Sequence, residues 1–226
     1  MKLHSLSLLA ASTLALGTAQ ASLIPIPNHS FEDPILAPGG IDFTHAGWTR
    51  NGAGGVFHPN GSNFLSASPL AAPADGNQLA FFESGTANPG SVTLTSAAPL
   101  TTAIAGFTYT LTAALGHRNL DAAGGRRPDD YLIELLLDNT PVASNTLLDA
   151  HTNIPSGTWV DLSTAFTPMI SGGEFTIRLT HSSDDATFRQ GVVDNIRLDA
   201  VPEPSTFALT ALGWGALLGL RRRRNG

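Results

Sequence analysis

The strongest constraint on the fold is an alternation of apolar and hydroxylated residues between Phe107 and Leu115. The odd positions of this segment are apolar, and the even positions are threonines except for Ala114. A period of two places successive side chains on opposite faces of an extended chain, whereas a helix needs a period near 3.6. The segment therefore predicts a β-strand with one buried and one polar face.

Five further segments have the composition of strands. Those around Val92 and Phe175 alternate in the same way, whereas 131–137 is apolar at both parities and indicates a more central strand. The other two are 159–166 and 192–198. Between the chain ends no 11-residue window carries a helical stripe, and the glycine pairs, such as Gly54-Gly55, fall between strands. We expect an all-β, antiparallel jelly-roll sandwich over residues 22–200.

The first 21 residues have the pattern of a secretory signal peptide. A single lysine precedes an apolar run from Leu6 to Leu16, and the segment ends on Ala19-Gln20-Ala21. The run is too short to span a bilayer, and small residues at these positions are typical of a cleavage site. The sequence predicts a signal helix that is cut before Ser22, and hence export. The alternative is a short buried helix.

The other end, residues 201–226, has three parts in a fixed order. Val201-Pro202-Glu203-Pro204 comes first, an apolar run from Phe207 to Leu220 follows, and four arginines end the run. About 14 residues make a helix of roughly 21 Å, a marginal membrane anchor, and the arginines would hold its end in the cytoplasm. We expect a C-terminal hydrophobic helix that inserts transiently into the membrane.

This order resembles the PEP-CTERM sorting signal, with Pro202, Glu203 and Pro204 as the sorting motif. The resemblance implies processing by a membrane protease of the exosortase type in a Gram-negative bacterium that makes exopolysaccharide. It also implies a final location at the cell envelope, the cell surface or the extracellular matrix. The alternative is a simple C-terminal membrane anchor.

Charge and cysteine content exclude several classes of function. The 226 residues include 12 basic and 18 acidic side chains, and 22–204 holds seven arginines, no lysine and all of the acids. Such a surface cannot neutralise a phosphate backbone, so nucleic acid is excluded as a partner. The absence of cysteine excludes disulfides, thiolate metal sites and cysteine nucleophiles. Stability then depends on the core, which a domain of this size can supply.

Six short segments are similar to the successive landmarks of galactose-binding-like jelly rolls, which include the CBM4/9-type carbohydrate-binding modules. In chain order they are 28–32 (NHSFE), 47–48 (GW), 75–79 (DGNQL), 106–111 (GFTYTL), 158–159 (TW) and 193–198 (VDNIRL). The chain departs from this pattern in a long loop at 120–130 and in 34–73, which carries few landmarks. The position of a pocket there is not predictable from the sequence.

Asp194 is the first candidate metal ligand. It shares the strand parity of Val192 and Ile196, so its carboxylate should point toward the interior, where an unpaired charge costs free energy. The resemblance implies that Glu32 and Asp194 hold a structural calcium ion, and calcium accepts carboxylate and main-chain oxygens. The alternative is that Asp194 accepts main-chain hydrogen bonds or pairs with an arginine.

Candidate sugar-binding residues are Trp48, for stacking, and Arg118, Asp130 and Tyr131, which flank the long loop and could recognise hydroxyl groups. The alternatives are a core position for the aromatic residues and a solvated loop for the others. The six histidines of the mature part are scattered, and no nucleophile elbow or helix zinc motif is present. We therefore expect no catalytic residues.

The sequence thus predicts a secreted, surface-sorted, non-catalytic β-sandwich that binds carbohydrate in an extracellular polysaccharide or biofilm matrix. A structural or adhesive matrix protein without a defined glycan ligand is the first alternative. An enzyme on the same scaffold, such as a lyase or a cyclase, is the second. An enzyme would require a deep cleft with groups of perturbed pKa.

Overall fold

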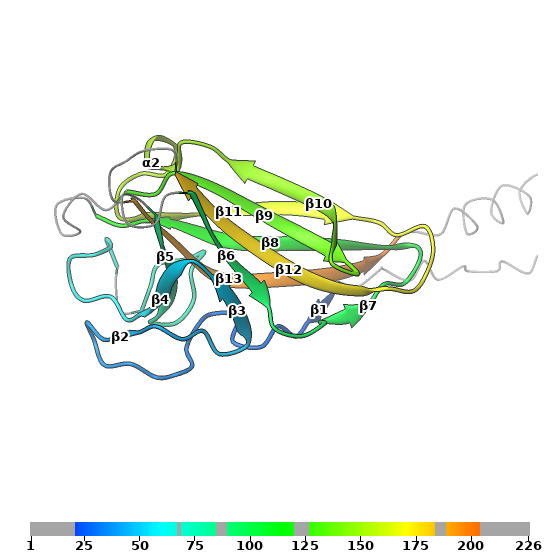
Figure 1. Ribbon diagram of the computed structural model, residues 1–226, viewed down its shortest axis with the longest axis horizontal. Helices are drawn as coiled ribbons and strands as arrows, with labels where there is room; N and C mark the ends of the chain where they lie inside the picture. Colours follow the sequence, from blue (N-terminus) through cyan, green and yellow to red (C-terminus); the bar gives the residue numbers. More distant parts are fainter. Residues whose placement is uncertain (1–20, 67–68, 85–89, 120–126, 184–188, 204–226) are drawn as a thin grey trace, which may run out of the picture.

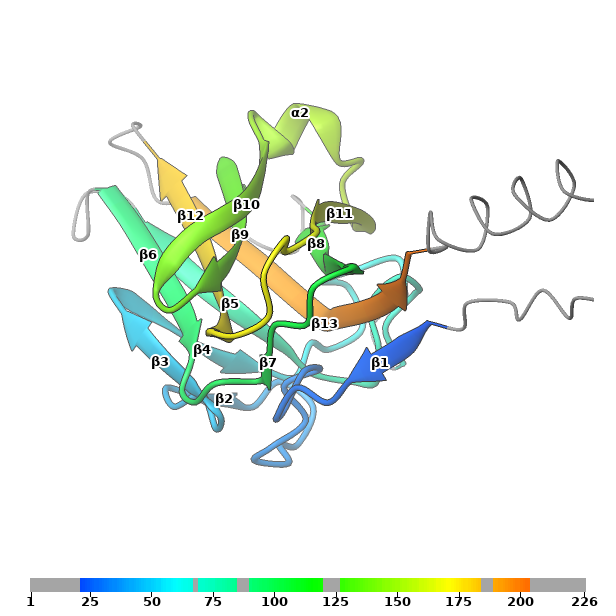
Figure 2. The same cartoon turned by 90° about the vertical axis from the view of Figure 1, so that its right-hand side faces the viewer.

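The computed structural model describes residues 21–66, 69–84, 90–119, 127–183 and 189–203. These residues form two antiparallel β-sheets stacked face to face, and α2 (Ala150–Asn153) is the one helix among them (Figures 1 and 2). The prediction of an all-β antiparallel sandwich is confirmed.

The first sheet has seven strands and the second has six. In spatial order the first consists of β11 (Thr158–Phe166), β8 (Phe107–His117), β13 (Arg189–Pro202), β5 (Leu79–Ser84), β4 (Ala53–Phe57) and β2 (Ile41–Asp42), with β1 (Ser22–Ile24) paired to β13. The second consists of β10 (Thr140–Leu147), β9 (Asp130–Leu137), β12 (Glu174–Ser183), β6 (Gly90–Ser96) and β3 (Trp48–Asn51), with β7 (Thr101–Thr102) paired to β12.

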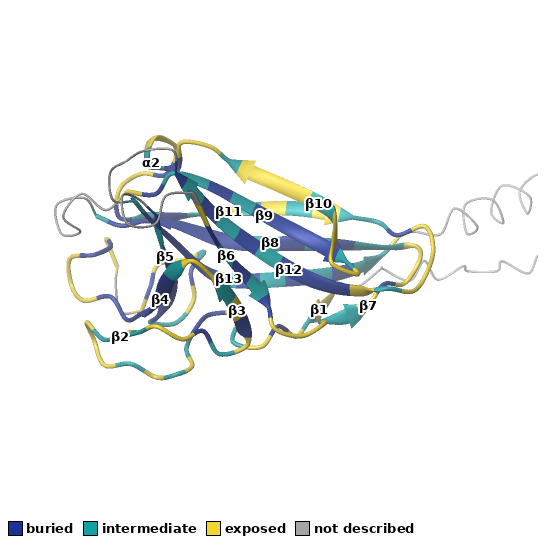
Figure 3. Cartoon of the chain, viewed as in Figure 1, coloured by how far each residue is buried: buried dark blue, intermediate teal, exposed yellow. Residues whose placement is uncertain are grey.

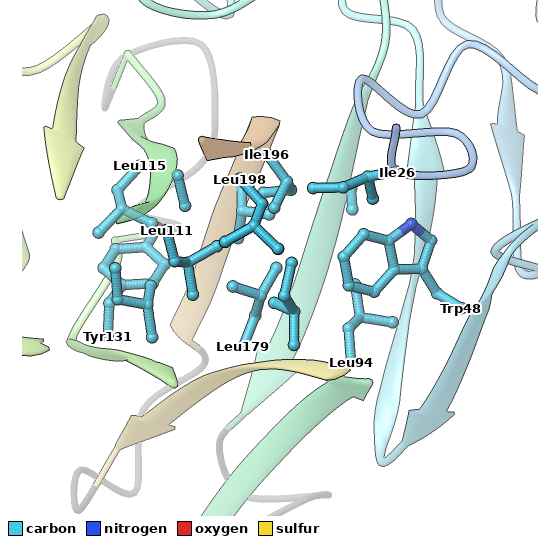
Figure 4. Packing of buried hydrophobic residues seen from close by; sticks show 14 of the residues in the cluster. Ile26, Trp48, Leu94, Leu111, Leu115, Tyr131, Leu179, Ile196 and Leu198 are labelled. Atoms are coloured by element: carbon cyan, nitrogen blue, oxygen red, sulfur yellow. The ribbon is translucent and has the colours of Figure 1, made fainter. Parts of the chain in front are cut away.

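The main core lies between the sheets and follows the predicted alternation. Tyr109, Leu111, Ala113 and Leu115 of β8 are buried, and Figure 4 shows leucines of both sheets in contact there. The apolar 131–137 segment forms β9, which is paired on both sides, by β10 and β12, as its composition predicts. Strand β10 at the edge of the second sheet is mostly exposed (Figure 3).

A second apolar cluster covers the outer face of the first sheet. Strand β5 directs Ala80 and Phe82 into the main core, whereas Leu79 and Phe81 pack outward. The connection between β4 and β5 folds back over this outer face and contributes Phe64 and two smaller apolar residues. The first sheet is therefore buried on both faces at β5, and its outer face can bear a pocket.

Gly54 and Gly55 lie inside β4, so the prediction that this pair separates two strands is wrong. A Cβ atom at Gly54 would lie 2.2 Å from the carbonyl oxygen of Phe81. A Cβ at Gly55 would lie 2.3 Å from the carbonyl oxygen of Asp42 and 2.9 Å from the Phe81 ring. The glycines are needed because the neighbouring backbone and the Phe81 ring approach β4 so closely.

The two ends of the described chain pair with each other. Strand β1 begins at Ser22, which lies opposite Ala200, and β13 continues to Pro202, opposite Phe107. The Glu203 carboxylate accepts hydrogen bonds from two threonine hydroxyls. Sheet structure thus extends two residues past the predicted boundary at 200. The predicted signal helix, Pro204 and the C-terminal hydrophobic helix lie outside the described residues, and within those residues no helix has the length and hydropathy to cross a membrane.

Two buried histidines make the fold sensitive to acid. Burial lowers the pKa of His45 and of His181 to about 4, from an ordinary value of 6.5. His181 is fully enclosed between the sheets, where its Nε2 accepts a hydrogen bond from the Asp129 amide. Nε2 of His45 is also buried but has no hydrogen-bond partner. Both side chains are therefore neutral in the folded protein at neutral pH.

We expect the free energy of unfolding to fall as the pH drops from about 6.5 to about 4. The unfolded chain protonates these histidines first, so the stability that they contribute is present above pH 6.5 and is lost toward their folded pKa values. Each contributes on the order of 3 kcal/mol to the fall. Urea unfolding of His45→Gln at both pH values should show a smaller loss than the unmodified chain; an equal loss would contradict this assignment.

Candidate functional site

Three acidic residues, Glu32, Asp75 and Asp194, lie near one another where the N-terminal turn meets β13. Asp194 is fully buried, and its Oδ2 accepts a hydrogen bond from the Asp75 amide at 2.8 Å. Its Oδ1 is buried without a partner. Burial raises the pKa of Asp194 well above its usual value, and the nearby charges of Asp75 and Glu32 raise it further. A buried acidic group with an unpartnered oxygen costs free energy unless a positive charge balances it.

Backbone geometry fixes Glu32 in this cluster. Its Oε1 accepts hydrogen bonds from the amides of Asn77 at 2.6 Å and Gln78 at 2.7 Å. Gly76 has φ +69°, and a Cβ there would lie 2.3 Å from this oxygen, so only glycine fits. The turn at Gly76 thus holds the Glu32 carboxylate by one of its two oxygens.

The structure places the predicted metal ligands Glu32 and Asp194 near each other, and Asp75 lies beside Asp194, to which its amide donates. The predicted alternative, a main-chain hydrogen bond to Asp194, accounts for only one of its two oxygens. The donors are all oxygens and two of the three residues lie on loops, which suits a hard cation such as Ca²⁺. Asp75 belongs to the DGNQL landmark, but no periodicity marked it as a ligand because it lies in a turn.

Trp48 and Tyr131 are core residues. The Trp48 ring lies 5.8 Å from that of Phe31, centroid to centroid, and its Nε1 donates to the Asn28 carbonyl. The Tyr131 hydroxyl donates to the Gly116 carbonyl and accepts from the Val192 amide. Burial raises the pKa of Tyr131. Neither ring offers a face to a ligand, in agreement with the core alternative.

Asp130 lies beside the start of α2, whereas Arg118 lies beside Gln190 of β13. An Asp130 carboxylate oxygen accepts a hydrogen bond from the Asp149 amide at the start of α2. Arg118 follows β8, is 7% exposed, and donates to the side chains of Gln190 and Asn63. The structure therefore does not unite the four predicted ligand-binding residues, but Arg118 lines a pocket.

That pocket lies on the outer face of the first sheet and has a volume of about 310 Å³. It is located around β2, β4 and β5, at the end of the sandwich away from β1 (Figure 1). The lining residues are Ile41, Phe43, Phe57, Phe81, Glu83, Arg118 and Gln190. The volume is at the lower end of the range for small-molecule sites.

The walls of the pocket are aromatic. Phe81 and Phe43 meet edge to face with ring centroids 6.4 Å apart, and Phe43 is 65% exposed. The Arg118 guanidinium lies 4.8 Å from the centroid of the Phe57 ring. Aromatic walls of this kind suit a flat apolar ligand, and ring faces stabilise positive charge that develops on it.

A hydrogen-bonded chain runs along the polar side of the pocket. Gln190 of β13 lies directly opposite Glu83 of β5, and its Nε2 donates to Glu83 Oε1 at 3.4 Å. Arg118 in turn donates to Gln190 Oε1, which sets the orientation of this amide. Glu83 is the one carboxylic acid among the lining residues and shares its face of β5 with Phe81. The arrangement places one carboxyl group beside aromatic walls.

Sequence reasoning missed Phe43, Phe81, Glu83 and Gln190. They come from separate segments, and Phe43 falls in 34–73, where the chain carries few landmarks. One signal was present in the sequence. Glu83 is an acid that directly follows the apolar run Leu79–Phe82, and in a strand it shares a face with Phe81. Only the register between β5 and β13 brings Gln190 to that acid.

Comparisons with solved structures give the same two-layer fold. A Stig cyclase from Fischerella sp. TAU in complex with (3Z)-3-(1-methyl-2-pyrrolidinylidene)-3H-indole has a TM-score of 0.65 at 22% identity, over 81% of this chain and 100% of that one. A cyclase from the same source in complex with 4-(1H-indol-3-yl)butan-2-one has a TM-score of 0.62 at 24% identity, over 80% and 98%. The arabinose-bound α-L-arabinofuranosidase MgGH51 matches at 0.53 and 13%, over 81% of this chain and 27% of that one.

A family model gives the functional class. The model HpiC1-like, described as HpiC1 cyclase, matches residues 22–199. No curated protein matches the chain.

The cyclase match corrects the predicted function. The prediction of a non-catalytic carbohydrate-binding or adhesive protein is wrong, and the alternative of an enzyme on the same scaffold is favoured. The expected partner is then a small molecule, in place of polysaccharide and an exosortase-type protease. The matched region ends at residue 199 and gives the PEP-CTERM interpretation no support. The error arose because the six landmarks are strand and turn residues, which report on a scaffold shared by binding proteins and enzymes.

Proposed function

Because the chain belongs to the HpiC1-like cyclase family, we propose that it closes a ring in a small aromatic molecule bound in the pocket formed around β2, β4 and β5. The observation that carries this proposal is the position of a single carboxylic acid, Glu83, beside aromatic walls. Ring closure needs both an apolar chamber that folds the substrate and a group that transfers a proton.

The lining predicts the substrate class. Three phenylalanine rings and an isoleucine favour a planar apolar ring system, and the acidic character of 22–204 disfavours anions. Two similar cyclases were crystallised with indole compounds. We therefore infer a neutral or cationic aromatic substrate, with an indole as the first compound to test.

In the proposed mechanism the pocket holds the substrate folded, so that the two atoms that bond lie in contact. The Glu83 carboxyl donates a proton to an unsaturated carbon, and the positive charge that develops is stabilised by the Phe43 and Phe81 rings. The new carbon–carbon bond forms as the substrate's own π electrons attack the cationic centre. Loss of a proton to the Glu83 carboxylate then restores the acid, and the product is an isomer of the substrate.

Arg118 and Gln190 act as positioning residues in this scheme. Arg118 holds Gln190, and Gln190 donates to Glu83 Oε1, so the other carboxyl oxygen is left to carry the proton. The guanidinium is itself held over Phe57 and by Asn63, so it stays beside the wall of the pocket.

Glu83→Gln should lower the rate of ring closure by about 10²–10⁴-fold, because the amide cannot supply the proton. Binding of 4-(1H-indol-3-yl)butan-2-one, measured by calorimetry, should change little, since the aromatic walls remain. Conversion of candidate indole substrates to products of equal mass is followed by chromatography and mass spectrometry. Glu174→Gln, an exposed acid on the second sheet, is the matched control. Undiminished turnover in Glu83→Gln would exclude Glu83 as the acid.

We also propose that Glu32, Asp75 and Asp194 bind a structural calcium ion. The support is the unpartnered, buried Oδ1 of Asp194 within a group of three acids. A cation there would neutralise the acids and link the N-terminal turn to β13, whose Ile196 amide already donates to the His29 carbonyl at 2.9 Å. None of the three acids lines the aromatic pocket, so the proposed role of the ion is stability rather than catalysis.

Removal of calcium with a chelator should lower the melting temperature, and added Ca²⁺ should restore it, because the three acids repel one another when no cation is bound. In Asp194→Asn the response to chelator should be lost. The control is Asp33→Asn, which removes an exposed acid next to Glu32 and should leave the response intact. A chelator response of the same size in Asp194→Asn would contradict the site.

Export remains a proposal, supported by the signal-like pattern of residues 1–21 and by the start of β1 at Ser22. Cleavage before Ser22 would leave every pairing of β1 with β13 in place. Mass spectrometry of the protein recovered from its native host should find Ser22 as the first residue. Recovery from the cytosol with Met1 or Lys2 retained would refute export.

A further inference from the structure

A group of metal-binding side chains gathers at α2, away from both sites described so far. Asp129 directly precedes β9, Asp149 directly precedes α2, and His151 lies in α2. One ligand atom from each lies within 4.8 Å of the other two. Helix α2 lies at the side of the molecule occupied by β9 and β10, whereas β2 and β1 lie at the opposite side in both views (Figures 1 and 2).

Hydrogen bonds hold the two segments of this group together. The Ala150 amide donates to the Asp129 carbonyl at 3.1 Å, and the Asp149 amide donates to the Asp130 carboxylate at 2.9 Å. Asp129 Oδ2 accepts a hydrogen bond from the Ser183 hydroxyl at 2.7 Å. The backbone is thus fixed before any ion arrives, and Asp129 Oδ1 and the Asp149 carboxylate remain as donors to a cation.

Unpartnered imidazole nitrogens provide a second, independent observation. Nδ1 of His151 is buried and has no hydrogen-bond partner. His117, which is 2% exposed, directs Nδ1 to the Ile154 carbonyl just after α2 at 2.7 Å, and its Nε2 is also buried without a partner. Burial lowers the pKa of His117, and the nearby His151 lowers it further. Buried nitrogens of this kind cost free energy unless something binds them.

We propose that Asp129, Asp149 and His151 form a binding site for a divalent transition-metal ion of the Zn²⁺ type. One imidazole and two carboxylates are the donors that zinc, nickel and cobalt accept, whereas Ca²⁺ takes oxygen ligands. Three protein ligands leave a fourth position for water or for a neighbouring nitrogen. The ion links the start of β9 to α2 and closes this end of the sandwich. The acidic surface of the domain draws cations to it.

The test uses the full chain after chelation and reloading with Ca²⁺, so that the calcium site is filled. Titration with Zn²⁺ should show one bound equivalent that raises the melting temperature, and Co²⁺ should give the visible absorption of a nitrogen-ligated ion. His151→Ala should weaken Zn²⁺ binding by at least about tenfold and abolish the cobalt spectrum. Asp149→Asn should also weaken Zn²⁺ binding and abolish the cobalt spectrum. Because Asp149 is exposed, this variant keeps the test valid if His151→Ala does not fold.

His29→Ala is the matched control, because His29 also lies near a carboxylate, that of Asp75, at 4.0 Å. It should leave Zn²⁺ binding unchanged. The proposal is overturned if the unmodified chain binds no Zn²⁺ at micromolar concentration. It is also overturned if both His151→Ala and Asp149→Asn bind it as tightly as the unmodified chain.

Discussion

The burial of β5 on both faces is the constraint on which the rest of the structure depends. Ala80 and Phe82 fill the space between the sheets, and Leu79 and Phe81 form the floor of a second apolar cluster outside it. If the outer face of the first sheet were solvated, Phe81 would expose its ring to water. Because the connection between β4 and β5 covers this face, an enclosed aromatic pocket can form beside it, with Glu83 at its edge.

Two distinct polar sites of the sandwich depend on how β13 pairs with its neighbouring strands. At one, Asp194 lies on the outer face of the first sheet, opposite Ala114, and is buried there just before the pairing of β13 with β8 changes register between Asp194 and Arg197. At the other, Gln190 reaches Glu83 because β13 and β5 pair in register. Strand β13 thus serves both the proposed calcium site and the proposed catalytic pocket, because Gln190 and Asp194 lie on the same face of the strand, before its register shift.

Parts of these sites could be predicted from the sequence. Glu32 and Asp194 were predicted as metal ligands because Glu32 belongs to the NHSFE landmark and Asp194 shares the strand parity of apolar residues. The ligand residues were harder to find, since Trp48 and Tyr131 look the same in a strand whether they pack inside or face a ligand. The pocket residues could not be found, because Phe43, Glu83 and Gln190 are separated by long stretches of chain and meet only through strand order.

The sequence by itself determined the all-β class, several of the strands and the buried side of the alternating strand Phe107–Leu115, because a period of two is a local property of the backbone. It also excluded nucleic acid and cysteine chemistry through charge and composition. Only the tertiary structure decided that the outer face of the first sheet is covered, that Gly54 and Gly55 lie within a strand, and which acid faces an aromatic pocket. These features depend on contacts between distant segments, which no local pattern encodes.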